Sequence, residues 1–82
     1  MENETRVAVM SIIVENIASV ETLNNTLHEY RDFIIGRMGI PYHQKKINII
    51  SIALDAPQDV ISALSGRVGN LEGVNVKTTF SK

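Results

Sequence analysis

The chain has 82 residues and a mass of 9.1 kDa, which leaves room for one hydrophobic core and predicts a single domain over residues 1–82. Its 8 basic and 9 acidic residues exclude a strongly basic nucleic-acid-binding protein, and no apolar run is long enough to cross a membrane. The sequence contains no cysteine, which excludes disulfides and thiolate chemistry, and its acidic start, Met1–Glu4, lacks the basic segment of a signal peptide, so we expect a cytoplasmic protein.

The first predicted element is a strand over residues 5–14. Apolar side chains occupy both of its alternating sets of positions, which are Val7, Val9 and Ile13 on one side and Ala8, Met10, Ile12 and Val14 on the other. A strand that is apolar on both sides is typical of the interior of a sheet.

A helix is predicted next, from Val20 to about Tyr30, with Ser19 as its N-cap. Its apolar residues are spaced three or four apart, so they form one stripe that has to pack against the rest of the domain. Residues 33–40 predict a second strand, in which embedded glycines indicate a bulge or a close approach by another group. Pro41 cannot donate a backbone hydrogen bond and favours a place at the sheet edge.

A third strand is predicted over residues 47–54, again with apolar side chains on both sides. The segment Asp55–Gln58 carries the signals of a helix start, with Asp55 as the cap and Pro57 in the first turn, and Gly69 is a typical helix end. Residues 74–80 alternate between apolar and polar side chains, which predicts a final strand with one wet face.

The order strand–helix–strand–strand–helix–strand predicts the α+β class with a ferredoxin-like βαββαβ arrangement. In that fold a four-stranded antiparallel sheet carries both helices on one face, and the first and third strands are central. The two strands that are apolar on both sides are the ones that this topology places in the middle, so pattern and topology agree.

The second face of such a sheet has no helix to cover it. In this sequence Val7, Val9 and Ile13, or their neighbours of opposite parity, would line it together with Ile47 and Ile49. An apolar patch of that size favours a homo-oligomer, a dimer or a tetramer, formed through the sheet face or the edge strands. The alternative is that these are the scattered apolar residues found on any protein surface.

We find no set of residues typical of an enzyme. No serine lies in a Gly-x-Ser-x-Gly turn. Glu15 and Asp55 each lie at the end of a central strand and would approach one another if those strands ran parallel, but helix-entry and capping roles are the more common explanation of such carboxylates. We therefore expect a protein that is not an enzyme and that has no cofactor.

Two side chains are candidates for binding. His28, beside Glu29 and Asp32, is either a metal ligand or a solvated histidine on a helix. Arg37, between two glycines, either meets an anionic ligand or a partner's carboxylate, or it faces water. The pair Lys45-Lys46 is too short for a nucleic-acid patch, so we expect no direct contact with nucleic acid, and none with a membrane.

The sequence resembles the family of short proteins named iron-only hydrogenase system regulators. The segments that carry the resemblance are LHEYRDFIIGRMGIPY at residues 27–42, NIISI at 48–52, DAPQDVISALSG at 55–66 and GVNVKT at 73–78. That family is similar to the C-terminal ligand domain of nickel-responsive repressors and, more distantly, to ACT domains. Both are ferredoxin-like regulatory modules that bind small effectors and assemble through their sheets.

The resemblance implies a transcriptional-regulator-type module that senses a small effector, lacks its own DNA-binding domain and acts through homo-oligomerisation. The alternatives are a nickel- or iron-responsive sensor and a purely structural module that binds a protein partner. His28 is the residue here that falls near a metal-binding histidine of the nickel-responsive domain. The expected effector-binding residues come from the first strand–helix loop and the second strand, and they are Glu15, Asn16, Ser19, Gly36, Arg37, Gly39 and Tyr42.

Overall fold

The computed structural model describes residues 4–81. The acidic start that speaks against a signal peptide includes residues 1–3, which lie outside the described part. Its elements in chain order are β1 (Arg6–Val14), α1 (Val20–Glu29), β2 (Ile34–Tyr42), β3 (Ile47–Ala56), α2 (Gln58–Gly69) and β4 (Val74–Phe80). A 3-10 turn precedes α1 at Ile17–Ser19, and another follows it at Arg31–Phe33.

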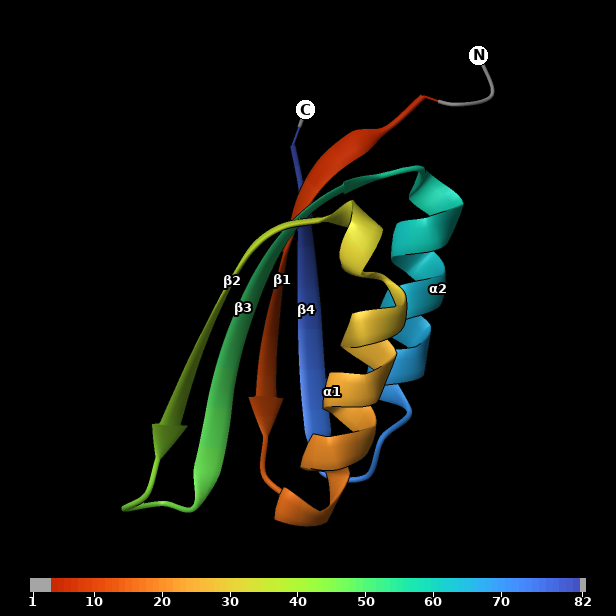
Figure 1. Ribbon diagram of the computed structural model, residues 1–82. Helices are drawn as coiled ribbons and strands as arrows, with labels where there is room; N and C mark the ends of the chain where they lie inside the picture. The colour runs from red at the N-terminus through yellow and green to blue at the C-terminus, as the bar shows by residue number, and fades with distance from the viewer. Residues whose placement is uncertain (1–3, 82) are drawn as a thin grey trace.

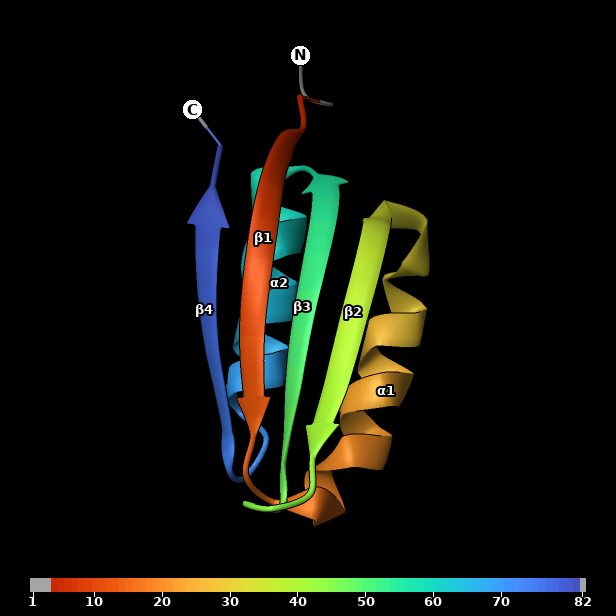
Figure 2. The same ribbon diagram turned by 90° about the vertical axis from the view of Figure 1, so that its left-hand side faces the viewer.

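The four strands form one antiparallel sheet in the order β2-β3-β1-β4. Figure 1 shows both helices on the same side of this sheet, and Figure 2 shows the opposite face with no element in front of it. The predicted ferredoxin-like α+β fold is therefore confirmed, with β1 and β3 in the centre as expected.

The core lies between the sheet and the helices. Its fully buried side chains come from alternate positions of the central strands and from one stripe of each helix, and the largest are Met10, Ile12, Val14, Ile52 and Leu54 from the strands and Leu23, Leu27, Ile61, Leu64 and Val68 from the helices. Since the even-numbered residues of β1 face the helices, its odd-numbered residues face the open side, which decides the parity that the sequence left open.

Ser19 is the N-cap residue of α1, as predicted, whereas the predicted cap of α2 differs from the structure. The Ser19 side chain makes no capping bond, however. At the second helix β3 runs on to Ala56, so Pro57 takes the N-cap position and Asp55 stays within the strand. Pairing with β1 explains the longer strand, because Arg6 and Ala56 lie opposite each other in the ladder.

The idea that Glu15 and Asp55 approach each other is wrong. The central strands are antiparallel, and Asp55 lies opposite Val7, at the start of β1, whereas Glu15 follows the end of β1. The two carboxylates therefore lie at opposite ends of the sheet.

Strand β2 is an edge strand, as Pro41 indicated. Its pairing with β3 shifts between Ile34 and Gly36, which makes Ile35 the extra residue of a bulge. Only Ile34 is half-buried, and every residue from Ile35 to Tyr42 is exposed. The strand is thus attached through its partner strand rather than through the core.

Candidate functional site

The structure divides the predicted effector-binding residues among three places. Glu15 and Asn16 lie in a pocket at one end of the sheet, and Ser19 is buried beside them. Arg37 and Gly39 line a groove between β2 and α1. The remaining two, Gly36 and Tyr42, lie on the open face of the sheet, opposite Ala53 and Ile47 of β3.

The loop between β1 and α1 is held by its own hydrogen bonds. The Glu15 backbone N–H donates to the Gly73 carbonyl at 2.7 Å, and the Ser19 hydroxyl donates to the Glu72 carbonyl at 2.7 Å. The Asn16 side-chain oxygen accepts from the Ala18 N–H at 3.0 Å. These bonds join the loop to the turn before β4, so the Ser19 hydroxyl already has a partner within the protein.

The pocket beside this loop has a volume of about 400 Å³. Its lining residues are Glu15, Asn16, Ile17, His43 and Lys46. The last two come from the hairpin turn between β2 and β3 and were missed in the sequence. Because Val14 lies opposite Asn48 in the ladder, that turn reaches the same end of the sheet as residues 15–17, so a register prediction for β1 and β3 is the signal that would have found them.

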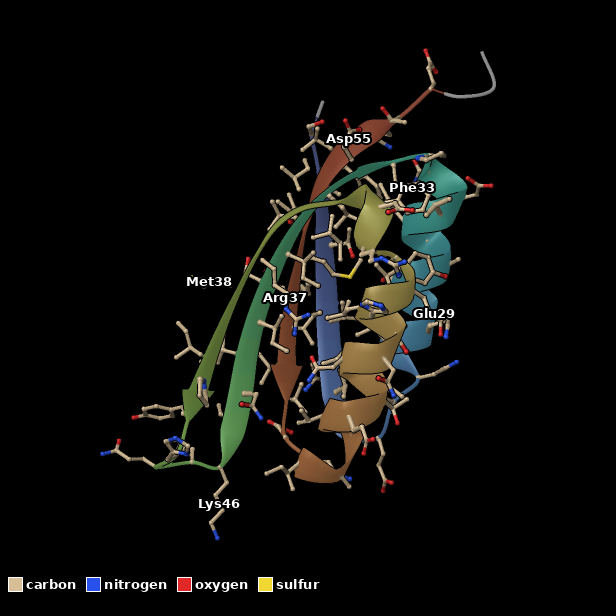
Figure 3. All side chains as sticks on the ribbon, in the orientation of Figure 1. Glu29, Phe33, Arg37, Met38, Lys46 and Asp55 are labelled. Carbon is tan, nitrogen blue, oxygen red and sulfur yellow. The ribbon has the colours of Figure 1, made fainter. Side chains whose placement is uncertain are left out.

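The groove between β2 and α1 is smaller, about 220 Å³. Figure 3 shows the Arg37 side chain extending from β2 toward α1, where its Nη2 donates to the Asn24 side-chain oxygen at 2.6 Å. The floor and walls are apolar side chains and amides; the lining residues besides these two are Val20, Gly39, Ile40, Pro41, Asn48 and Ile50. Asn24 and Asn48 were not among the predicted site residues, because neither lies next to Arg37 in the sequence.

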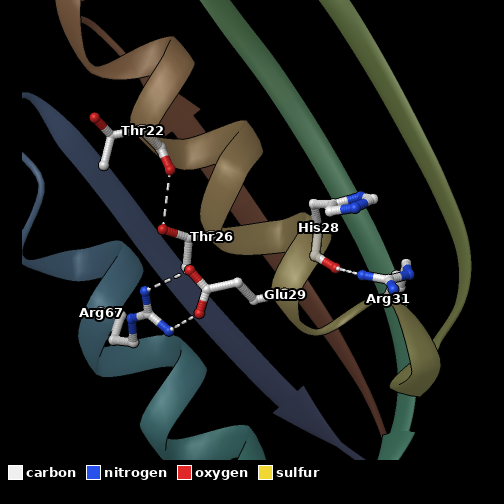
Figure 4. A network of polar contacts seen from close by, with 6 residues as sticks. All are labelled: Thr22, Thr26, His28, Glu29, Arg31 and Arg67. Atoms are coloured by element: carbon white, nitrogen blue, oxygen red, sulfur yellow. Dashed lines mark hydrogen bonds and ion pairs between the residues drawn. The ribbon is translucent and has the colours of Figure 1, made fainter.

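His28 and the carboxylate next to it lie on different sides of α1, as Figure 4 shows. Glu29 accepts two hydrogen bonds from Arg67 of α2, at 2.8 and 3.3 Å, and this guanidinium lowers the pKa of the Glu29 carboxyl below its ordinary value. Within residues 4–81 no three His, Cys, Asp or Glu side chains gather closely enough to hold a metal ion. A metal role for His28 remains a prediction from the resemblance.

The structure also bears on the membrane question. Among the helices of residues 4–81, none combines the length and the apolar character needed to cross a membrane.

Comparisons with known proteins place the chain in a family. The family model described as "TM1266-like: Iron-only hydrogenase system regulator, putative" matches residues 6–78. The solved structure of TM1266 from Thermotoga maritima, described as an uncharacterized protein, is 34% identical and superposes with a TM-score of 0.92, covering 96% of this chain and 100% of that chain. No curated protein matches the sequence.

A more distant similarity shows the fold alone. A formyltetrahydrofolate deformylase from Pseudomonas putida KT2440 is 14% identical, with a TM-score of 0.64, and the match covers 89% of this chain but 28% of the deformylase. The family match, by contrast, extends over nearly all of the elements described above, including the Arg37 strand and both helices. This chain belongs to the TM1266-like family, as its resemblance to the iron-only hydrogenase system regulators indicated.

Proposed function

We propose that the chain is a non-enzymatic regulatory module that works as an assembly, in which two copies meet through the open faces of their sheets. The description of its family as a regulator supports the regulatory part. The observation that carries the proposal is the apolar character of the sheet face that no helix covers.

The open face presents large apolar side chains from three adjacent strands. They are each between 37% and 56% exposed, and they are Val7, Val9 and Ile13 of β1, Met38, Ile40 and Tyr42 of β2, and Ile49 of β3. Ile40, Ile49 and Ile13 lie side by side across the sheet, because each is opposite the next in the ladders. A contiguous apolar patch of this kind is uncommon on proteins that remain single in water.

The size of the face suits a second copy of the chain. Strands of 7 to 10 residues, four abreast, give a face of roughly 19 by 30 Å at the usual strand spacing and rise. That is about 600 Å² before side-chain relief is counted, which approaches the ~800 Å² that each partner buries in an interface of standard size. A two-fold pair would therefore cover the whole patch with no other element needed.

The charges on the face also suit a second copy. Between residues 7 and 79, the strand pairing places only two charged side chains on the open face. They are Asp55, at one end of β3, and Lys77, on the edge strand β4. Both lie at the margin, which leaves the centre uncharged, as in the core of a protein interface. Each copy contributes one carboxylate and one ammonium group, so the charges of two copies balance.

The test replaces one apolar residue on the face and one elsewhere. Ile13→Lys places an ammonium group in the centre of the face, and Ile17→Lys makes the same change at a side chain that is 78% exposed in the loop after β1. Light scattering should give twice the 9.1 kDa chain mass for the wild type and for Ile17→Lys, and about the single-chain mass for Ile13→Lys. Circular dichroism establishes that both variants fold. A doubled mass that survives Ile13→Lys in a folded protein would contradict the proposal.

A further inference from the structure

The side of β2 that faces the helices is uncovered as well. Arg37 and Gly39 lie opposite Ile52 and Ile50 of β3, whose side chains are buried under the helices, so residues 37 and 39 are on the helix side of the sheet. Nevertheless both are exposed, because α1 packs only weakly on β2. The result is the groove of about 220 Å³ that opens between the strand and the helix.

The guanidinium of Arg37 has donors to spare in this groove. An arginine carries five N–H donors in a planar fork, and Asn24 accepts from Nη2. Within residues 4–81, the one ion pair between an arginine or lysine and a carboxylate joins Arg67 to Glu29. In this part of the chain no carboxylate neutralises Arg37. The remaining N–H groups of the fork can donate to both oxygens of a carboxylate.

The remaining lining limits what else the ligand can be. Val20 and Ile50 offer an apolar floor, and Asn24 and Asn48 offer neutral amide groups. One cation among neutral amides suits one negative charge rather than two. The volume lies below the roughly 300–1,000 Å³ of pockets for drug-sized ligands, so the ligand is small.

We infer that the groove between α1 and β2 binds a small monocarboxylate, with its carboxylate on the Arg37 guanidinium and its short apolar body against Val20 and Ile50. The inference deepens the proposed regulatory function, on which its biological meaning rests, by naming the class of effector. It gives Arg37 and Gly39 a shared role, whereas Gly36, on the other side of the strand, takes no part.

The two glycines of β2 supply a matched pair of variants. A Cβ added at Gly39 or at Gly36 has no atom within 4 Å, so Gly39→Ala and Gly36→Ala should both fold. The methyl group at position 39 projects to the groove side, and the one at position 36 projects to the open face, opposite Ala53. Only the first takes space from the ligand.

The experiment is a titration of the full chain with butyrate, followed by two-dimensional proton–nitrogen NMR. We expect butyrate to cause saturable chemical-shift changes of the Gly39 amide and the Asn24 side-chain amide. Arg37→Gln should bind butyrate at least about tenfold more weakly, because a charge-assisted pair is lost. Binding should be weaker in Gly39→Ala and unchanged in Gly36→Ala. Butyramide, which has the same shape without the charge, should not saturate the site. Inorganic phosphate should bind more weakly than butyrate.

The inference is overturned if butyrate gives no saturable shift, if Arg37→Gln binds it as well as the wild type does, or if phosphate binds more tightly than butyrate. These outcomes are separate from the test of self-association. A chain that is a single copy in light scattering but binds butyrate through Arg37 would contradict the proposed assembly and leave the binding site standing. A doubled mass without butyrate binding would do the reverse.

Discussion

Gly73 is the residue at which the backbone geometry is most restrictive. Its φ of +72° lies in the left-handed region, and a Cβ there would lie 2.6 Å from the Asn16 Cβ and 3.0 Å from the Asn16 backbone nitrogen. The same glycine accepts the Glu15 N–H at 2.7 Å. A side chain at this position would therefore strain the turn and push the loop after β1 away from β4.

We predict that Gly73→Ala lowers the free energy of unfolding by about 2 kcal/mol or more, from the left-handed backbone and the close backbone contact together. The control is Gly66→Ala, which makes the same change inside α2, where a Cβ has no atom within 4 Å. That variant should be more stable than the wild type by up to about 1 kcal/mol. Urea unfolding measures both, and equal effects of the two substitutions would contradict this account.

At the scale of single residues the sequence predicts local roles and misses distant ones. Gly69 was expected to end a helix, and α2 ends there. Ser19 occupies the expected N-cap position of α1, but its hydroxyl bonds to the carbonyl of Glu72, which is 53 residues away. A local sequence pattern cannot indicate a hydrogen-bond partner that comes close only when the sheet folds.

At the scale of elements, the two helices are joined by a polar contact at their exposed sides. Arg67 of α2 pairs with Glu29 of α1 at 2.8 Å, and its guanidinium also lies over the Tyr30 ring, 5.6 Å from the ring centre. The carboxylate raises the pKa of the arginine, and the arginine lowers that of the carboxyl. Both charged forms are thus favoured by the folded state.

This pair should make stability depend on pH in one direction. A carboxyl whose pKa is lowered by folding stabilises the protein above its ordinary pKa of 4.5, and this contribution is lost as the pH falls toward the lower, folded-state pKa. Glu29→Gln should therefore be less stable than the wild type at neutral pH, and the difference should disappear in acid. Because the pair is exposed, we expect a small effect.

A double-mutant cycle of Glu29→Gln and Arg67→Gln, measured by urea unfolding at neutral and at acid pH, isolates the interaction from other effects of each change. A favourable coupling energy at neutral pH and none in acid agrees with the ion pair. A coupling that persists in full after the carboxyl is protonated would contradict the ion pair.

The elements themselves were predictable wherever burial decides them. β1 and β3 were expected in the centre because both of their faces are apolar, and they lie there. The start of α2 was misplaced because Asp55 and Pro57 carry capping signals that compete with the ladder between β1 and β3, and pairing up to Ala56 prevailed. Helix signals are local, whereas the end of a strand is set by its partner.

At the scale of the whole molecule, β2 is the element that both proposals share. Met38, Ile40 and Tyr42 belong to the open face, and Arg37 and Gly39 belong to the groove on the other side. A ligand in the groove would thus lie against the strand that supplies part of the apolar patch. The two faces of one strand could then connect effector binding with assembly.

The apolar second face was predictable from the sequence, but the grouping of the candidate site was not. The loop Glu15–Ser19 and the strand Gly36–Tyr42 were expected to form one site. Tyr42 pairs with Ile47 of β3, which lies near the end of β1 and so near the loop. Gly36 pairs with Ala53 of β3, which in turn pairs with Val9, toward the start of β1 and away from the loop. Which residues of an edge strand share a side depends on a bulge that the sequence only hinted at through its glycines.

The most direct test of this account is the mass of the wild-type chain at equilibrium. Sedimentation equilibrium in the micromolar range should give twice 9.1 kDa, with dissociation on dilution, because a bare apolar face costs free energy in water that a second copy removes. A single species of 9.1 kDa over the whole range would contradict the claim that the open face is an interface between copies of this chain.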